Sequence, residues 1–111
     1  MVIVAVRDLV FRSRIEAAAG RLGVTVRVAP RGAPLAEVVR EAPGATVLAD
    51  LGEPGMLDEI GAIERAGGAR VVGFLGHLRQ DLMEAAAAAG ADEILTRGQF
   101  VARLDDLLRR A

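Results

Sequence analysis

Five short apolar runs, rich in valine, isoleucine and leucine, alternate along this chain with longer segments whose apolar residues recur at helical spacing. The runs predict strands at residues 2–7, 24–28, 45–50, 70–74 and 92–96. Several are apolar at consecutive positions, which is typical of strands covered on both faces. Strands that alternate with helices in this way predict a parallel sheet crossed by helices.

Each interval after a run carries the apolar spacing of an amphipathic helix. Gly23 and Gly90 follow the first and fourth predicted helices, where glycine readily takes the left-handed conformation that ends a helix. The residues that define the five helical faces are Ile15, Ala18, Ala19 and Leu22; Leu35, Val38 and Val39; Met56, Ile60 and Ile63; Leu82 with the alanines 85–89; and Phe100, Leu104, Leu107 and Leu108.

The chain is therefore predicted to form one α/β domain, spanning residues 1–111, with a flavodoxin-like doubly wound sheet of five parallel strands. The expected strand order is 2-1-3-4-5, with helices on both faces. A hydrophobic content of 52% is enough to bury the core of such a domain. Ligands of this fold bind outside the carboxyl ends of the strands, near strands 1 and 3.

Charged residues gather at the predicted carboxyl ends of the strands. Arg7 and Asp8 follow the first strand, Asp50 ends the third, His77 follows the fourth, and Arg97 follows the fifth. Because the carboxyl ends of parallel strands meet at one edge of the sheet, these five side chains are expected to converge there.

Two segments carry a recognisable pattern: residues 50–56 read Asp-Leu-Gly-Glu-Pro-Gly-Met, and residues 88–97 read Ala-Ala-Gly-Ala-Asp-Glu-Ile-Leu-Thr-Arg. They resemble the receiver domains of bacterial response regulators, of the kind found in chemotaxis regulators. The first segment is similar to the phosphoacceptor turn of receivers, which makes Asp50 the phosphoacceptor-like residue, and the second is similar to the stretch leading into the receiver lysine. The resemblance spans nearly the whole chain.

The chain departs from the receiver pattern at the positions that carry the chemistry. The resemblance implies an acidic pair after strand 1 that binds a divalent cation together with the strand-3 aspartate, a hydroxyl after strand 4, an aromatic residue on strand 5 and a lysine after it. These positions are occupied by Arg7 and Asp8, Leu75, Arg97 and Ile94, and the chain contains no lysine.

These departures predict altered chemistry at Asp50. Mg²⁺ requires hard oxygen ligands, and the Arg7 guanidinium removes one ligand and repels the cation, so only a weak Mg²⁺ site at Asp8 and Asp50 remains. No other cofactor is predicted. Arginine at position 97 is not interchangeable with lysine, and it is expected to contact a phosphoryl group or to pair with Asp50 or Asp8. We therefore interpret the chain as a degenerate receiver, or pseudo-receiver, without conventional phosphorylation switching.

Alternative hypotheses remain open from the sequence. Asp50 of a single-domain response regulator could accept a phosphoryl group, or it could simply cap the next turn or pair with Arg7. A third hypothesis is a small-anion or nucleotide sensor, in which Arg7, Arg97 and His77 form an anion-binding site. The sequence alone does not choose among these.

Several function classes find little support in the composition. With one histidine and no cysteine, tyrosine or tryptophan, the chain is not expected to be an enzyme. A net charge of -1 and three aromatic residues do not favour nucleic acid. No apolar run approaches the roughly 20 residues of a membrane helix, and the first run lacks the flanks of a signal peptide, so a cytoplasmic protein is expected.

The remaining hypothesis is a signalling or protein-interaction module. The fourth predicted helix contains five consecutive alanines, Ala85 to Ala89, which would let another helix approach closely. In receivers the face formed by the fourth and fifth helices commonly binds partners or forms dimers. We therefore expect a protein partner or a homodimer through this face.

Overall fold

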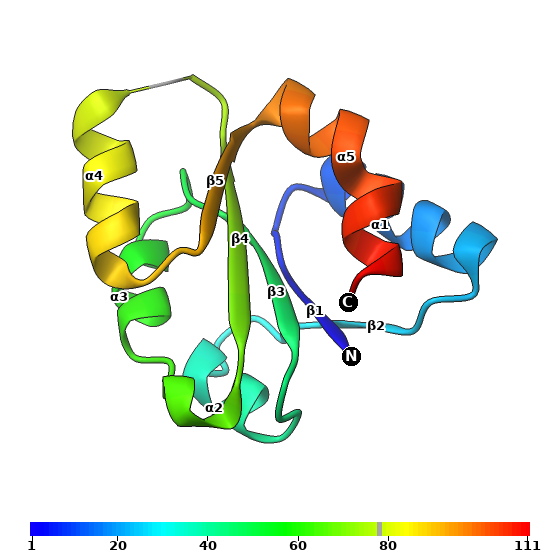
Figure 1. The fold of residues 1–111 in the computed structure, drawn as a ribbon, viewed down its shortest axis with the longest axis horizontal. Helices are drawn as coiled ribbons and strands as arrows, with labels where there is room; N and C mark the ends of the chain where they lie inside the picture. Colours follow the sequence, from blue (N-terminus) through cyan, green and yellow to red (C-terminus); the bar gives the residue numbers. More distant parts are fainter. Residues whose placement is uncertain (78) are drawn as a thin grey trace.

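A computed structural model describes residues 1–77 and 79–111, and it contains a five-stranded parallel sheet in the order β2-β1-β3-β4-β5 (Figure 1). The strands are β1 Val2–Ala5, β2 Val26–Val28, β3 Thr46–Asp50, β4 Arg70–Leu75 and β5 Glu93–Thr96. The helices are α1 Leu9–Leu22, α2 Leu35–Arg40, α3 Met56–Gly61, α4 Gln80–Ala89 and α5 Arg97–Arg109, with a short 3₁₀ helix at Arg65–Gly67. The predicted fold class and strand order are confirmed.

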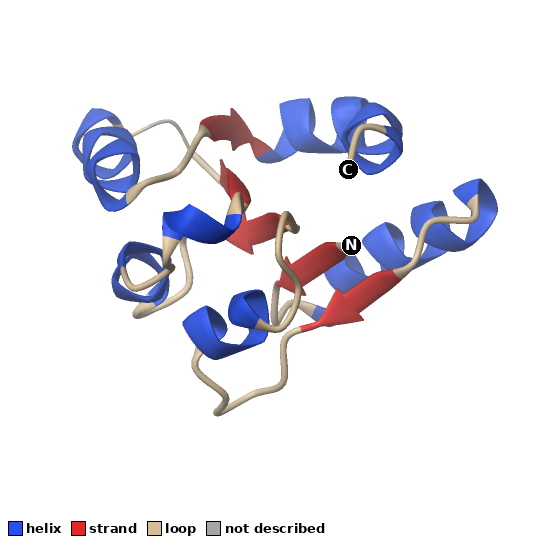
Figure 2. Ribbon diagram, turned by 60° about the horizontal axis from the view of Figure 1, so that its bottom comes forward, coloured by secondary structure: helices blue, strands red, loops and turns tan. Residues whose placement is uncertain are grey.

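Helices cover both faces of the sheet (Figure 2). On one face α2, α3 and α4 pack over alternate residues of the central strands, including Ile3, Val47 and Val71. On the other face α1 and α5 pack over the remaining residues, including Val4 and Leu48. The sheet is therefore buried on both faces, which explains why its strands are apolar at consecutive positions.

The three phenylalanines of the chain form one cluster between the sheet and the α1–α5 layer. The ring of Phe74 on β4 stacks on Phe11 of α1 with centroids 4.6 Å apart, and it lies 4.5 Å from the ring of Phe100 on α5. Aromatic pairs at these separations add about 0.5–1.5 kcal/mol each to the hydrophobic gain. This cluster fixes the start of α1 and of α5 against the end of β4.

The first two predicted strands are too long by two residues. The first strand ends at Ala5 and not at Arg7, because the Arg7 N–H donates to the Glu53 side chain and not to a neighbouring strand. The second begins at Val26 and not at Val24, because the Val24 N–H donates to the Ala19 carbonyl and so completes the end of α1. Gly23 has φ 70°, the left-handed conformation predicted for it.

Other boundaries differ by less. The third and fifth strands begin one residue later than predicted, at Thr46 and Glu93, and the fourth ends one residue later, at Leu75. The third helix ends at Gly61, so Ile63 lies beyond it, although this side chain is still buried in the core as its spacing indicated. Differences of this size are common at the ends of elements.

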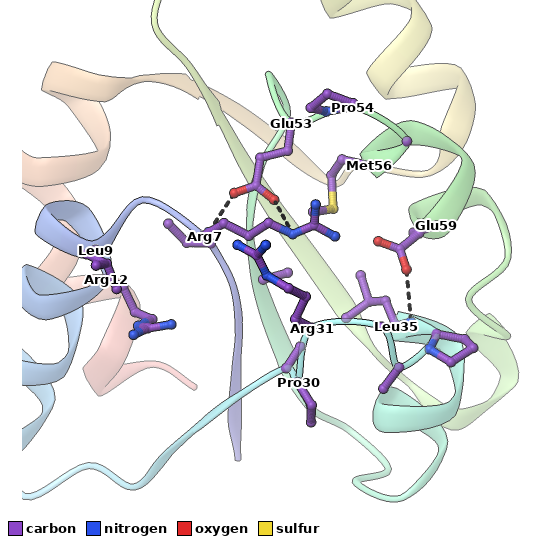
Figure 3. Close-up of a pocket in the computed structure, with 17 residues that line it drawn as sticks. Arg7, Leu9, Arg12, Pro30, Arg31, Leu35, Glu53, Pro54, Met56 and Glu59 are labelled. Carbon is purple, nitrogen blue, oxygen red and sulfur yellow. Dashed lines mark hydrogen bonds and ion pairs between the residues drawn. The ribbon is translucent and has the colours of Figure 1, made fainter.

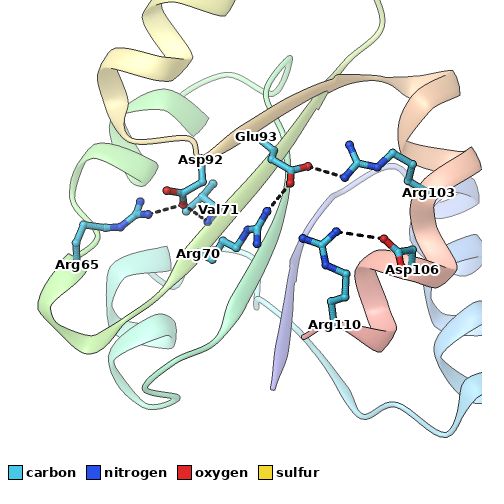
Figure 4. Close-up of polar contacts among 8 residues, drawn as sticks. All are labelled: Arg65, Arg70, Val71, Asp92, Glu93, Arg103, Asp106 and Arg110. Atoms are coloured by element: carbon cyan, nitrogen blue, oxygen red, sulfur yellow. Dashed lines mark hydrogen bonds and ion pairs between the residues drawn. The ribbon is translucent and has the colours of Figure 1, made fainter.

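Arginine–carboxylate pairs tie the amino ends of β4 and β5 together (Figure 4). Asp50 lies at the opposite, carboxyl end of the parallel strands, as the last residue of β3. Glu93 on β5 receives a hydrogen bond from Arg70 of β4, and its other oxygen lies 3.1 Å from Arg103 of α5. Asp92 accepts hydrogen bonds from the Val71 N–H and from Arg65. These contacts hold the edge strand β5 in register.

Candidate functional site

Asp50 is the last residue of β3 and the only buried charged residue that the structure describes, with 6% of its surface exposed. Its Oδ1 accepts a hydrogen bond of 3.0 Å from the Gly52 N–H, which closes the turn after the strand. A side chain at position 52 would put its Cβ 3.3 Å from this oxygen, so glycine gives the carboxylate room. The turn therefore presents Asp50 at the carboxyl edge of the sheet.

The backbone next to Asp50 is fixed by Leu51, the following residue, which packs against β4. The Leu51 N–H donates to the Phe74 carbonyl, and the Leu51 side chain lies directly over Gly73. A Cβ added at Gly73 would lie 2.6 Å from three carbons of Leu51, so the Leu51 side chain would have to move to make room for it. Gly73 thus allows Leu51 to fill the core next to Asp50.

Arg97 is the first residue of α5, and its guanidinium points toward Asp50. Its Nη2 lies 3.8 Å from Asp50 Oδ2, and its Cζ lies 5.6 Å from the centroid of the Phe11 ring. Thr96 and Gln99 form a capping box, in which each side chain accepts a hydrogen bond from the other residue's N–H. The capped start of α5, the Phe11 ring and the Asp50 carboxylate together hold the Arg97 guanidinium in place.

Arg7 takes a different partner. Its backbone N–H donates to Glu53 Oε1 at 2.5 Å, and its Nε lies 3.7 Å from Glu53 Oε2. The Glu53 side chain is only 12% exposed, so this carboxylate is held between the β1–α1 and β3–α3 loops. Of the two arginines predicted near Asp50, Arg97 pairs with it and Arg7 pairs with Glu53.

Sequence reasoning missed Glu53 as a member of the site. Its partner Arg7 is 46 positions away, and the pair forms only because the two loops cross at the sheet edge. The sequence did carry a signal: the basic residue Arg7 follows the first strand, and the acidic residue Glu53 lies three residues after Asp50.

Asp8 caps α1 and is exposed. Its Oδ1 accepts a hydrogen bond of 3.0 Å from the Phe11 N–H, which satisfies an amide at the start of the helix. Among residues 1–77 and 79–111, no three histidine, aspartate or glutamate side chains come close enough to hold a metal ion. Mg²⁺ commonly takes one or two carboxylates and keeps several waters, so the weak Mg²⁺ site at Asp8 and Asp50 stays a prediction.

The remaining candidate positions lie after β4 and on β5. Leu75, at the position where the resemblance implies a hydroxyl, is 2% exposed and belongs to the core. His77 is exposed, and none of the described hydrogen bonds or ion pairs involves it. Ile94 is half-buried and packs against the α2–α4 layer. The anion-binding role of His77 with Arg7 and Arg97 stays a prediction.

Comparison with known families and curated proteins gives no match. Solved structures do match. The signal receiver domain of the response regulator NarL from Mycobacterium tuberculosis has a TM-score of 0.77 and 21% identity, over 98% of this chain and 92% of that one. A response regulator from Thermotoga maritima has a TM-score of 0.68 and 21% identity, over 98% and 91%.

A third similar structure comes from a protein assigned to pilus assembly, CpaE of Burkholderia thailandensis, with a TM-score of 0.66, 21% identity and coverage of 98% and 94%. At these identities the likeness shows the fold, which is that of response-regulator receiver domains. None of the described helices is long and apolar enough to cross a membrane.

Proposed function

We propose that this chain is a pseudo-receiver, a signalling module that acts through protein contacts and does not switch by conventional aspartyl phosphorylation. One observation carries the proposal: the side chain after β1 is a guanidinium tied to Glu53, where the receiver resemblance implies a carboxylate for a metal ion. A cation at that place opposes the binding of Mg²⁺ beside Asp50.

The state of Asp50 supports the same proposal. One carboxylate oxygen accepts from the Gly52 N–H and the other lies near Arg97, while 9% of the side chain is exposed. Both oxygens therefore have protein partners. A phosphoryl donor would have to displace the Arg97 guanidinium from Asp50, and no metal ion would then replace the positive charge of that guanidinium.

The positions that would transmit a signal support it too. A phosphoryl group on Asp50 usually orders its surroundings through new hydrogen bonds. The Leu75 side chain has no hydrogen-bonding group, and Ile94 lacks the aromatic ring that the resemblance implies for the switch. Neither of these two positions could therefore transmit phosphorylation of Asp50 to α4.

The test is exposure of the protein to acetyl phosphate and Mg²⁺, read by intact-protein mass spectrometry. We expect no addition of a phosphoryl group to the wild-type chain, as for Asp50→Asn, while a conventional receiver treated alongside becomes phosphorylated. Addition of one phosphoryl group to the wild type that Asp50→Asn abolishes would overturn the proposal.

That contrary result would favour the second candidate, a single-domain response regulator with Asp50 as phosphoacceptor. In this candidate the Arg97 guanidinium, which lies 3.8 Å from Asp50, would leave the carboxylate and donate to the phosphoryl oxygens, for which a guanidinium is a bidentate donor. Its distinguishing requirement is that Arg97→Ala lowers the phosphorylated fraction.

We also propose that partners bind through the face formed by α4, β5 and α5. β5 is an edge strand, and its outer backbone groups have no neighbouring strand. α4 lies beside β5 (Figure 1). Ala85 and Ala88 of α4 are exposed, and their small side chains would let a second element approach closely. A homodimer, or a complex with another protein of the same pathway, would cover this edge.

Sedimentation analysis of a matched pair of variants tests the interface. Ala88→Arg on α4 is expected to abolish self-association or partner binding, whereas Ala17→Arg, an exposed alanine on α1, is expected to leave it unchanged. A wild-type protein that is monomeric at every concentration would rule out the homodimer. Equal effects of the two variants would show that the face formed by α4, β5 and α5 is not the interface.

A further inference from the structure

A cavity of about 560 Å³ opens at the carboxyl ends of β1, β2 and β3, beside the Asp50 turn (Figure 3). It lies between the start of α1, the β2–α2 loop and the β3–α3 loop. Asp50, Arg97 and His77 are not among its lining residues. Its volume falls within the roughly 300–1,000 Å³ of small-molecule sites, and its place agrees with the rule for ligand crevices in doubly wound sheets.

Three arginines line this cavity, and Figure 3 shows the side chains of Arg7 and Arg31 reaching into the same space. Arg7 pairs with Glu53, and Arg12 pairs with Glu16 on its own helix at 3.5 Å. Arg31 has no acidic partner among the residues that the structure describes.

The two carboxylates of the cavity are already occupied. Glu53 accepts from the Arg7 N–H, and Glu59 accepts a hydrogen bond of 3.3 Å from the Leu35 N–H at the start of α2. With Glu16, the partner of Arg12, three guanidiniums face three carboxylates in and beside the cavity. Arg31 is the one of these guanidiniums without a carboxylate partner among the described residues.

The rest of the cavity is apolar. Val6, Leu35 and Met56 are buried side chains that form part of its wall, and Pro30, Pro34 and Pro54 also line it. No aromatic side chain lines it, so it offers no ring on which a nucleobase could stack. The cavity fits a compact apolar group better than a nucleotide.

From this arrangement we propose that the cavity binds a small organic anion, an apolar body bearing one carboxylate or phosphate group that Arg31 and Arg7 hold. The anionic group neutralises Arg31 and relieves the repulsion between the two guanidiniums in one space. The apolar body covers Val6, Leu35 and Met56. This site is separate from Asp50, so it does not depend on whether Asp50 is phosphorylated.

The experiment is an amide NMR titration with three probes of similar body: benzoate, phenylphosphate and the uncharged benzyl alcohol. We expect benzoate or phenylphosphate to shift the amides of Arg7, Arg31, Gly32 and Gly55, and benzyl alcohol to shift them far less. The stronger of the two anions identifies the preferred group. No shift with either anion, or equal shifts with benzyl alcohol, would overturn the proposal.

Two matched variants assign the effect. Arg31→Gln removes the unpaired charge and is expected to weaken binding of the better anion about tenfold or more, the size of one charge-assisted hydrogen bond. Arg14→Gln makes the same change at an exposed residue outside the cavity, and should leave the affinity within about twofold. Equal losses of affinity in both variants would mean that binding depends only on the overall charge of the protein, and this would contradict the proposed site.

Discussion

The Arg97 guanidinium lies 3.8 Å from the Asp50 carboxylate, at the position where the receiver resemblance implies a lysine. Asp50 is buried and Arg97 is half-exposed, so the pair joins the end of β3 to the start of α5. A carboxylate that loses such a partner keeps the cost of its burial.

A double-mutant cycle at these two residues should measure their coupling. Arg97→Gln is expected to lower the free energy of unfolding by about 1 kcal/mol, because it leaves Asp50 charged and unpaired. In an Asp50→Asn background the same change should cost almost nothing, giving a coupling of about 0.5–1 kcal/mol in urea unfolding. Purely additive effects would mean that the pair contributes no stability.

Gly73→Ala should destabilise the fold more than any surface change. The added Cβ would lie 2.6 Å from Leu51, so the Leu51 side chain must move and the cost should be about 1–3 kcal/mol. Gly20→Ala on α1 is the control, since nothing lies within 4 Å of its Cβ, and it should stabilise by about 0.5–1 kcal/mol. Both values come from urea unfolding.

Leu51→Ala provides the second arm of this test. In that background Gly73→Ala should cost much less, because the clash is removed. A Gly73→Ala penalty that is the same with leucine and with alanine at position 51 would contradict the packing argument.

Glu93→Gln should weaken the attachment of β5. Its carboxylate is 22% exposed and faces Arg70 and Arg103, although the Arg103 contact lacks the alignment of a hydrogen bond. The neutral amide is expected to cost about 1 kcal/mol in thermal or urea unfolding. The control Glu41→Gln, whose carboxylate is 62% exposed beside Arg27, should cost less than about half of that.

Acid should destabilise the fold partly through Asp92. Burial raises the pKa of Asp92, but hydrogen bonds from the Val71 N–H and from Arg65 outweigh it, so this pKa lies below its ordinary 3.8. A carboxyl group with a lowered pKa stabilises the fold above its unfolded value and loses that contribution as the pH falls through the folded one.

Asp92→Asn should therefore flatten the decline of stability below pH 3.8. Urea unfolding of the two proteins at neutral pH and below that value measures the difference. Parallel curves for wild type and variant would show that Asp92 does not take part in the acid response.

The helices and strands were predictable because the spacing of apolar residues within each segment encodes them. Consecutive apolar residues at Val47 and Leu48 indicated a strand covered on both faces, and each of them packs in a different layer. Strand ends were less predictable. The first strand stops early because Arg7 finds Glu53, a contact between loops that no local pattern encodes.

The candidate site was predicted in part for the same reason. The rule for carboxyl ends of parallel strands brought Asp50 and Arg97 to one edge, and their separation is 3.8 Å. The partner of Arg7 and the cavity lined by Arg31 depend instead on the paths of three loops, which the periodicity of the elements does not fix.

The most direct measurement is an amide NMR titration of the wild-type protein with beryllofluoride and Mg²⁺, which together mimic an aspartyl phosphate. We expect the amide signals around Asp50 and those of α4 and α5 to keep their positions, because Arg7 opposes metal binding and the Asp50 carboxylate already contacts Gly52 and Arg97. Shifts centred on Asp50 that spread to α4 and α5, and that Asp50→Asn abolishes, would contradict this expectation.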